Sequence, residues 1–194
     1  MSEKTMSDVS IRAVMDGIEG IMGTNGLKTI LNYAKLSYLF DNKPPYSFAK
    51  NYTEEEFAAL TDSIYVIVGI RGATALIRLI GREIAKFVIE QGMFASTLEL
   101  EGEERFLKIV DIYIMVTERG RVYKENDIIY FDYKECTGCK DKVSKSPMCS
   151  TIVGFFSECL RWVGLDDMEI VETKCKAVGD ETCLYEIRPI NRDR

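Results

Sequence analysis

Three cysteines and one glutamate near the C-terminal end of the sequence have the residue types and the spacing of a metal site. Cys175 and Cys183 lie equally far on either side of Gly179. A hairpin that turns at this glycine would place the two thiols opposite each other or one diagonal step apart. Glu172 precedes Cys175 by three positions. On a regular strand these two side chains point to opposite faces, so Glu172 can join the thiols only where the strand bends or bulges.

Cys149 would reach the same place from a preceding helix. Ser146 and Pro147 form a favoured helix start, with serine as the cap and proline in the first turn. Cys149 falls in that turn, where the helix dipole and free backbone N–H groups favour the thiolate. Three thiolates and one carboxylate suit tetrahedral zinc in a closed, structural site. The spacing alone leaves a second interpretation equally open, in which these are ordinary buried or cross-strand cysteines.

The other three cysteines allow several interpretations. Cys136 and Cys139 have the Cys-x-x-Cys spacing of metal and redox sites. They could form a redox-active dithiol in a loop, supply two further ligands that compete for the same metal, or be an idle pair that faces solvent. Cys159 lies among apolar residues of the predicted helix, which favours a place in the core.

The composition indicates a globular protein. The 194 residues, of which 46% are apolar and 29% are charged, suffice for a compact domain with an N-terminal extension. The formal net charge of -6 argues against a nucleic-acid surface. The N-terminus has no signal pattern, and Arg71 and Arg78 interrupt the most apolar stretch, so we expect no membrane span. We predict a cytoplasmic location, where thiols stay reduced.

The sequence contains no histidine. It therefore lacks the most frequent general base, haem ligand and nitrogen ligand for zinc. Gly69, Gly72 and Gly81 do not have the spacing of a dinucleotide-binding loop. Because neither a nicotinamide or flavin motif nor a paired proton donor is evident, the sequence favours a protein without enzymatic activity.

Apolar periodicity predicts helices followed by a small antiparallel sheet. Thr53 and Glu56 form a capping-box pattern at the start of one helix, and the β-branched run 64–68 leaves the start of the next open to a strand. The first two strands are expected to form a hairpin with a three-residue turn, 125–127. The predicted helices are 8–23, 26–40, 53–60, 61–91, 104–118 and 147–163, and the predicted strands are 122–124, 128–133, 168–175 and 182–187.

The run from Glu172 to Tyr185, preceded by the Cys149 helix, resembles the vinyl-4-reductase-like (4-vinyl reductase) domain family. The family includes a protein linked to bacteriochlorophyll synthesis, sensor domains of aromatic-responsive bacterial transcription activators, and stand-alone archaeal proteins, and this chain resembles the last kind. In the sensor relatives, three cysteines and a glutamate bind zinc. The resemblance therefore implies a zinc ion on Cys149, Glu172, Cys175 and Cys183.

The resemblance extends over residues 128–188 in its motif and over residues 26–120 in pattern. The wider fold is similar in outline to haem nitric-oxide sensors and to TRAPP subunits, although a haem is not expected because the histidine that such sensors use is absent. The resemblance implies an α+β fold, in which N-terminal helices pack on a small antiparallel sheet and a C-terminal helix and hairpin bind zinc. It divides the chain into a helical extension, residues 1–60, and a ligand-binding domain, residues 61–190.

The function that the resemblance implies is a zinc-stabilised binding or sensor module for a small hydrophobic ligand, in a homodimer. The alternatives are a reductase of a tetrapyrrole vinyl group and a dimeric scaffold or adaptor protein. In the family the ligand pocket lies between helices and sheet. Aromatic residues could line such a pocket, although core packing is the more frequent role of each. These residues are Phe106, Tyr113, Tyr123, Tyr130, Phe155, Phe156 and Trp162.

Overall fold

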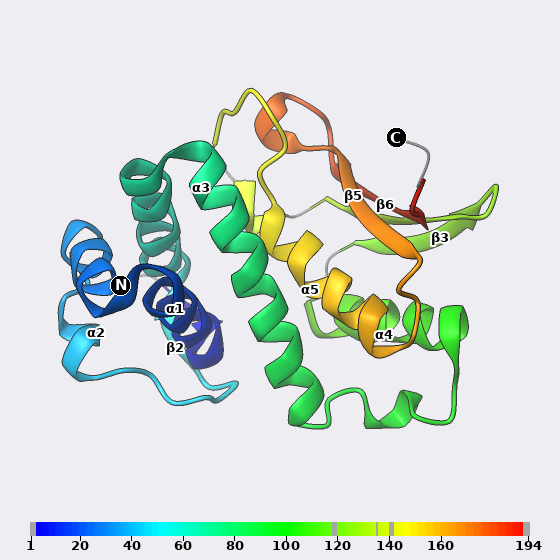
Figure 1. Ribbon diagram of the computed structural model, residues 1–194, viewed down its shortest axis with the longest axis horizontal. Helices are drawn as coiled ribbons and strands as arrows, with labels where there is room; N and C mark the ends of the chain where they lie inside the picture. The colour runs from blue at the N-terminus through cyan, green and yellow to red at the C-terminus, as the bar shows by residue number, and fades with distance from the viewer. Residues whose placement is uncertain (1–2, 118–119, 135, 140–141, 192–194) are drawn as a thin grey trace. The chain divides into compact units, whose positions relative to one another are not determined.

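The computed structural model describes residues 3–117, 120–134, 136–139 and 142–191 (Figure 1). Its helices and small antiparallel sheets confirm the predicted α+β class. Contacts divide the chain into two compact units, Met1–Ile84 and Ala85–Arg194. The predicted boundary after residue 60 concerns the extent of the ligand-binding domain, and it stays a prediction.

The N-terminal unit consists of helices and one pair of strands. Helices α1 (Asp8–Tyr33) and α2 (Tyr38–Asp41) are followed by the first part of α3 (Glu54–Glu90). Strands β1 (Lys4–Ser7) and β2 (Lys50–Thr53), which the sequence analysis did not predict, pair antiparallel with each other. Helix α1 is interrupted where the first helix was predicted to end, because Gly23 has a φ of 70°. The predicted second helix stops early, at Tyr33, since Lys35 takes the left-handed conformation with a φ of 59°.

The capping box at the start of α3 is confirmed. The Glu56 backbone N–H donates to Thr53 Oγ1 at 3.1 Å, and the Thr53 N–H donates to Glu56 Oε2 at 2.9 Å. The predicted break at Thr61 is wrong. The Thr61 hydroxyl donates to the Phe57 carbonyl at 3.0 Å, so it bonds within the helix instead of capping a new one. The residues 64–68 are helical, and the helix is interrupted at Gly69, whose φ is 72°.

Helix α3 is the one described helix with the length and apolar composition of a membrane span. Its most apolar window is 33% buried. Buried core helices of soluble proteins share both properties, so neither property assigns a span to this chain.

The core of the N-terminal unit is aliphatic and closely packed. Residues from α1, α2 and α3 make up a continuous buried cluster, in which Ile11, Ile18 and Leu31 are fully shielded from solvent. Gly17 allows a close approach between helices, because a Cβ atom at this position would lie 2.5 Å from Ile80 Cγ1. A larger residue at position 17 would force Ile80 to move.

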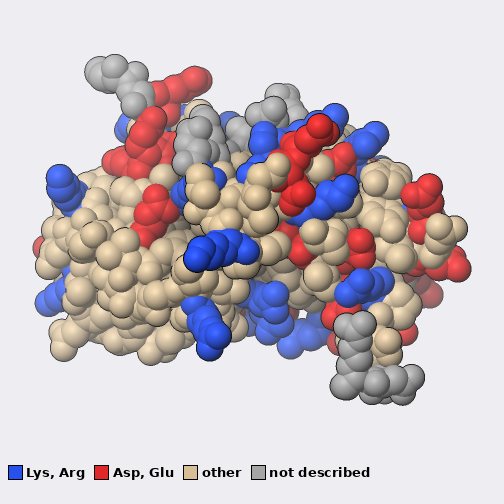
Figure 2. Space-filling view, turned by 90° about the horizontal axis from the view of Figure 1, so that it is seen from above, with Lys and Arg blue, Asp and Glu red and all other residues tan. Residues whose placement is uncertain are grey.

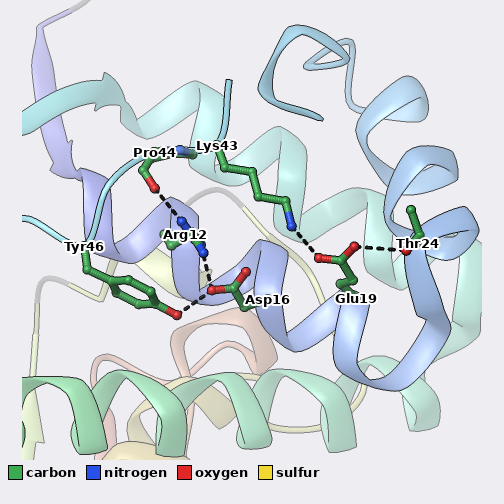
Figure 3. Close-up of polar contacts among 7 residues, drawn as sticks. All are labelled: Arg12, Asp16, Glu19, Thr24, Lys43, Pro44 and Tyr46. Atoms are coloured by element: carbon green, nitrogen blue, oxygen red, sulfur yellow. Dashed lines mark hydrogen bonds and ion pairs between the residues drawn. The ribbon is translucent and has the colours of Figure 1, made fainter. Parts of the chain in front are cut away.

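Polar contacts hold the loop before β2 against the exposed side of α1 (Figure 3). Arg12 Nε lies 2.7 Å from Asp16 Oδ2, and Arg12 Nη1 donates to the Pro44 carbonyl at 3.0 Å. The Tyr46 hydroxyl donates to Asp16, and Lys43 pairs with Glu19. These groups are partly exposed, so each contact contributes little by itself.

The C-terminal unit packs two helices on a four-stranded sheet. Helices α4 (Gly102–Thr117) and α5 (Ser150–Trp162) contact each other and the sheet (Figure 1). The strand order is β3-β4-β6-β5, with every neighbouring pair antiparallel. The strands, all of them predicted to within two residues, are β3 (Arg121–Glu125), β4 (Ile128–Tyr133), β5 (Met168–Lys174) and β6 (Cys183–Pro189). Three short 3-10 turns complete the unit: η1 (Ala95–Thr97), η2 (Thr137–Cys139) and η3 (Lys176–Val178).

The turn between β3 and β4 is shorter than predicted. It contains two residues, Asn126 and Asp127, with φ values of 49° and 62°. Positive φ at both central positions is the geometry of a type I′ turn, whose twist matches that of the two strands.

Most of the aromatic residues proposed for a ligand pocket form the core of this unit. The Tyr113 ring packs edge-on against Phe131 at 5.9 Å and Phe156 at 5.2 Å. Phe106 and Phe155 join the same cluster through Phe156. On the opposite face of the sheet, Tyr123 stacks on Tyr130 with a centroid distance of 5.1 Å, and Trp162 lies next to Phe94.

Candidate metal centre

The structure brings all four predicted ligands together. Cys149 is the residue that precedes α5, Glu172 lies on β5, Cys175 directly follows β5, and Cys183 begins β6. One potential ligand atom from each of the four lies within 4.8 Å of the others. The three thiols are buried and Glu172 is half-buried. Residues from three elements therefore meet at one buried point.

A β-bulge removes the conflict between Glu172 and Cys175. Glu172 pairs with Tyr185 and Lys174 pairs with Leu184, so two steps along β5 correspond to one step along β6. The extra residue, Thr173, restores the parity that a regular strand denies to positions three apart. Beyond the bulge, Gly179 with a φ of 109° closes the turn, and the Cys175 N–H donates to Asp180 Oδ2 at 2.8 Å.

Cys149 has a different position in its helix from the predicted one. Helix α5 begins at Ser150, not at Pro147, and Cys149 is its N-cap residue without a side-chain capping bond. The Ser146 N–H bonds to Ser144 Oγ in the preceding loop, so Ser146 does not begin the helix. The Cys149 backbone N–H instead donates to Glu172 Oε2 at 2.9 Å. The carboxylate thus lies at the positive end of the helix dipole, and the thiol is left to face the other cysteines.

Distances between the sulfur atoms fit a tetrahedral zinc ion. Zinc–sulfur bonds of about 2.3 Å require tetrahedral ligand atoms to lie about 3.8 Å apart. The Cys149 sulfur lies 3.9 Å from that of Cys175 and 3.8 Å from that of Cys183. Both edges agree with the requirement.

The carboxylate of Glu172 has one oxygen to spare. Its Oε1 atom is buried and has no hydrogen-bond partner among the described residues, although such an atom ordinarily costs about 1–3 kcal/mol. Burial raises the pKa of Glu172, while hydrogen bonds to the carboxylate act in the opposite direction. A cation would satisfy this oxygen and keep the carboxylate ionised. The donor set and the unsatisfied oxygen both fit zinc.

The thiols compete for negative charge. Burial, above all, raises the pKa of Cys175 to about 12. Contact with Cys136 raises the pKa values of Cys149 and Cys183, whereas hydrogen bonds from the neighbouring thiols lower that of Cys139. Thiols this close together cannot all ionise by themselves, and a metal ion supplies the positive charge that allows it.

Cys136 and Cys139 belong to the same cluster. Both are buried, which contradicts the interpretation as an idle pair facing solvent. The Cys136 sulfur lies 3.1 Å from that of Cys149, and the Cys139 sulfur lies 3.3 Å from that of Cys183. With these two partners they form a second group of four thiols within 4.8 Å of one another. Their Cys-x-x-Cys spacing was the sequence signal for this role.

Two further residues complete the surroundings. Cys159 is fully buried outside the cluster, as the sequence analysis predicted, and burial raises the pKa of its thiol. Tyr185, which the sequence analysis did not single out, lies opposite Glu172 in the β5–β6 pair. Its hydroxyl is buried without a hydrogen-bond partner among the described residues. No sequence signal distinguishes such a tyrosine from an ordinary core residue.

All of these residues lie within one segment of known type. Residues 129–189 match the model of the vinyl-4-reductase (4-vinyl reductase) domain. The predicted resemblance to the vinyl-4-reductase-like family is thereby confirmed for this part of the chain, which we call the vinyl-4-reductase segment. It contains β4, α5, β5 and β6, and therefore every strand and α-helix that contributes to the thiol cluster.

The structure of the chain is similar to those of two kinds of sensor domain. An H-NOX protein from S. oneidensis, in its Fe(II)NO ligation state, matches with a TM-score of 0.66 and 14% identity, over 96% of this chain and 100% of that chain. The IWP-051-bound H-NOX from Shewanella woodyi, in its Fe(II)CO state, matches with a TM-score of 0.64 and 20% identity, over 97% of each chain. These identities establish a shared fold and no more.

The second kind of sensor domain is the phenol-responsive sensory domain of the transcription activator PoxR, solved with phenol. It matches with a TM-score of 0.53 and 13% identity, over 68% of this chain and 71% of that chain. No curated protein sequence matches the chain. The iron of the H-NOX structures has no histidine to bind here, because the sequence contains none.

Proposed function

We propose that this chain is a zinc-stabilised binding or sensor module for a small hydrophobic molecule. The observation that carries the proposal is the convergence of Cys149, Glu172, Cys175 and Cys183 on one buried point within the vinyl-4-reductase segment. The sulfur spacings and the unsatisfied Glu172 oxygen support zinc as the ion. The ligand set has no open position, which supports a structural role and not a catalytic one.

Zinc at this position would connect parts of the chain that are distant in sequence. Cys149 would tie the start of α5 to the two arms of the β5–β6 hairpin, which carry Cys175 and Cys183. Because the ligands come together only in the folded chain, the free energy of metal binding adds to the stability of the fold. The structural work of the ion is thus to hold the helix on the sheet.

The ligand-binding part of the proposal is supported by the fold. Two kinds of sensor domain share the fold, and the printed description of one names phenol as its bound molecule. We extend this to a small hydrophobic ligand here, bound by residues 61–190, in a cytoplasmic homodimer. Basic and acidic side chains are interspersed on the face seen in Figure 2. This mixture, with the net charge of -6, supports a ligand other than nucleic acid.

Metal analysis of the protein purified without added metal tests the zinc site. We expect stoichiometric zinc in the wild type and its loss in the C175S variant. The matched control is C159S, which changes an equally buried cysteine outside the cluster and should keep the zinc. A wild-type protein without bound metal, or equal metal content in C175S and C159S, would refute the site.

Native mass spectrometry of the same preparation tests the binding function. We expect an additional small apolar molecule to be retained, or phenol-like compounds to bind when supplied. Metal-loaded, folded protein that binds none of a panel of apolar compounds would leave zinc in place and remove the sensor proposal.

A further inference from the structure

Six donor groups form two sets of four that share an edge. Cys149 and Cys183 belong to both sets. Glu172 and Cys175 complete the first set, and Cys136 and Cys139 complete the second. We propose that the second set is a separate metal position, so that the cluster binds two thiophilic divalent cations that share the thiolates of Cys149 and Cys183. This inference rests on the zinc site proposed above.

Contacts between neutral thiols do not account for the second set. Its sulfur atoms approach to 3.1 Å for Cys136 and Cys149 and to 3.3 Å for Cys139 and Cys183. Even two carbon atoms, which are smaller, have their optimum at about 3.5–4.0 Å. Sulfur atoms so close need a shared positive charge between them, either a proton or a metal ion.

Charge balance favours the metal ion over protons. Adding one divalent cation together with the thiolates of Cys136 and Cys139 leaves the net charge of the buried cluster unchanged, since two negative charges and one dication cancel. A buried charge is costly unless it is paired. A thiolate sulfur has more than one lone pair and can bridge two cations. The second ion therefore adds ligand bonds without adding charge.

Local backbone geometry holds the second pair of ligands over the shared edge. Cys136 and Cys139 flank the 3-10 turn η2, and the Cys139 sulfur lies 3.8 Å from the Cys136 carbonyl oxygen. Gly138 sits directly above the thiols, since a Cβ atom there would lie 3.8 Å from both the Cys136 and the Cys149 sulfur atoms. The turn therefore covers the second position as the bulge of β5 covers the first.

The donor types assign a chemical class to the second ion. Four thiolates without an oxygen ligand select zinc, cadmium or another soft cation over magnesium or calcium. The first position includes a carboxylate oxygen, so the two positions differ in hardness. Cadmium, whose nuclear resonance depends on the number of sulfur ligands, is a suitable probe for both.

Counting bound ions in matched double variants of the full chain tests the proposal. Native mass spectrometry with zinc, and cadmium NMR after exchange, should show two ions and two resonances in the wild type. C136S/C139S should keep one ion, at the position that includes the carboxylate. E172Q/C175S should also keep one ion, at the four-thiol position. Circular dichroism of each variant checks that it is folded.

The outcomes separate this inference from the zinc site on which it rests. One ion in the wild type that is unaffected by C136S/C139S would overturn the second position and leave the first. Two ions in both the wild type and C136S/C139S would also overturn it, because the second ion would lie elsewhere. No bound metal in the wild type would overturn both. Should C136S/C139S fail to fold, wild-type stoichiometry and the number of cadmium resonances still decide.

Discussion

The two compact units of this chain are stabilised in different ways. The N-terminal unit buries a continuous set of aliphatic side chains from three helices and supports it with partly exposed ion pairs. The C-terminal unit buries aromatic rings between helix and sheet, together with five thiols and a carboxylate. Aliphatic burial is spread over many residues, so the loss of one is tolerable. A buried ligand cluster depends on every member, because removing one leaves the others unsatisfied.

This difference teaches where the chain is vulnerable. The N-terminal unit should respond to substitutions gradually, in proportion to the local packing or hydrogen bonding that each one disturbs. The C-terminal unit should respond to its cysteines abruptly and to reagents that remove metal. Four substitutions, taken from the largest expected effect to the smallest, can break or sharpen this contrast.

The C183S substitution should have the largest effect. Cys183 is fully buried and belongs to both ligand sets. Because apparent binding energies of structural zinc are on the order of 10 kcal/mol, we expect the C-terminal unit to lose at least ~5 kcal/mol or its native structure. Trp162, the single tryptophan of the chain, lies in this unit, so its fluorescence during urea unfolding measures the change. Chelation of the wild-type protein should have the same effect.

The control for C183S is C159S, which buries a hydroxyl in the core at a cost of about 1–3 kcal/mol. Hydrogen exchange of peptides from α1 should stay the same in both variants. The contrast between the units fails if C159S and C183S unfold at the same urea concentration.

The D8A substitution should have the largest effect of the three changes in the N-terminal unit. The Asp8 carboxylate is buried and accepts hydrogen bonds from Ser47 Oγ at 2.6 Å and Asn51 Nδ2 at 3.0 Å. Its removal leaves partly buried donors without an acceptor, at a cost of about 1–3 kcal/mol. Faster hydrogen exchange in α1 and β2, with unchanged metal content, is the expected result. Loss of metal in D8A would show that the two units do not respond independently.

Gly17 and Gly20 offer a matched test of packing within one helix. A Cβ atom at Gly17 would collide with Ile80, whereas one at Gly20 would meet nothing within 4 Å. We expect G17A to destabilise the N-terminal unit by about 1–3 kcal/mol through overpacking. G20A should stabilise it by roughly 0.5–1 kcal/mol through helix propensity. Equal effects of the two substitutions in urea unfolding would contradict the close packing inferred at Gly17.

The Y46F substitution should have the smallest effect and depend on pH. Burial and then the hydrogen bond to Asp16 raise the pKa of Tyr46 to about 12, above the usual value of 10. A raised pKa stabilises the fold below pH 10, and this contribution is lost as the pH rises through about 12. Since nearly half of the side chain is exposed, we expect Y46F to cost less than about 1 kcal/mol at pH 8.

Urea unfolding of Y46F and wild type at pH 8 and pH 11 measures this contribution, with Y33F as the control for an exposed tyrosine. The difference between Y46F and wild type should narrow at pH 11. A difference that widens would reverse the inferred sign.

Much of the fold was predictable because its signals are local. The capping box of Thr53 and Glu56 and the β3–β4 hairpin depend on neighbouring residues and occur as predicted. The pairing of β1 with β2 joins segments more than forty residues apart, so no local pattern could indicate it. The start of α5 was misplaced because Ser146 and Pro147 have the right types, while Glu172, distant in sequence, receives the Cys149 N–H.

The sequence by itself determined the donor atoms of the candidate metal centre. Its cysteines, its glutamate and its lack of histidine restrict the site to sulfur and oxygen ligands. Only the tertiary structure decided that Glu172 shares a face with Cys175, because that depends on the bulge between β5 and β6. It also decided that Cys136 and Cys139 lie within the cluster, since the packing of η2 against α5 and β6 brings their thiols to those of Cys149 and Cys183. Spacing along a chain determines which side chains are available, and packing determines which of them meet.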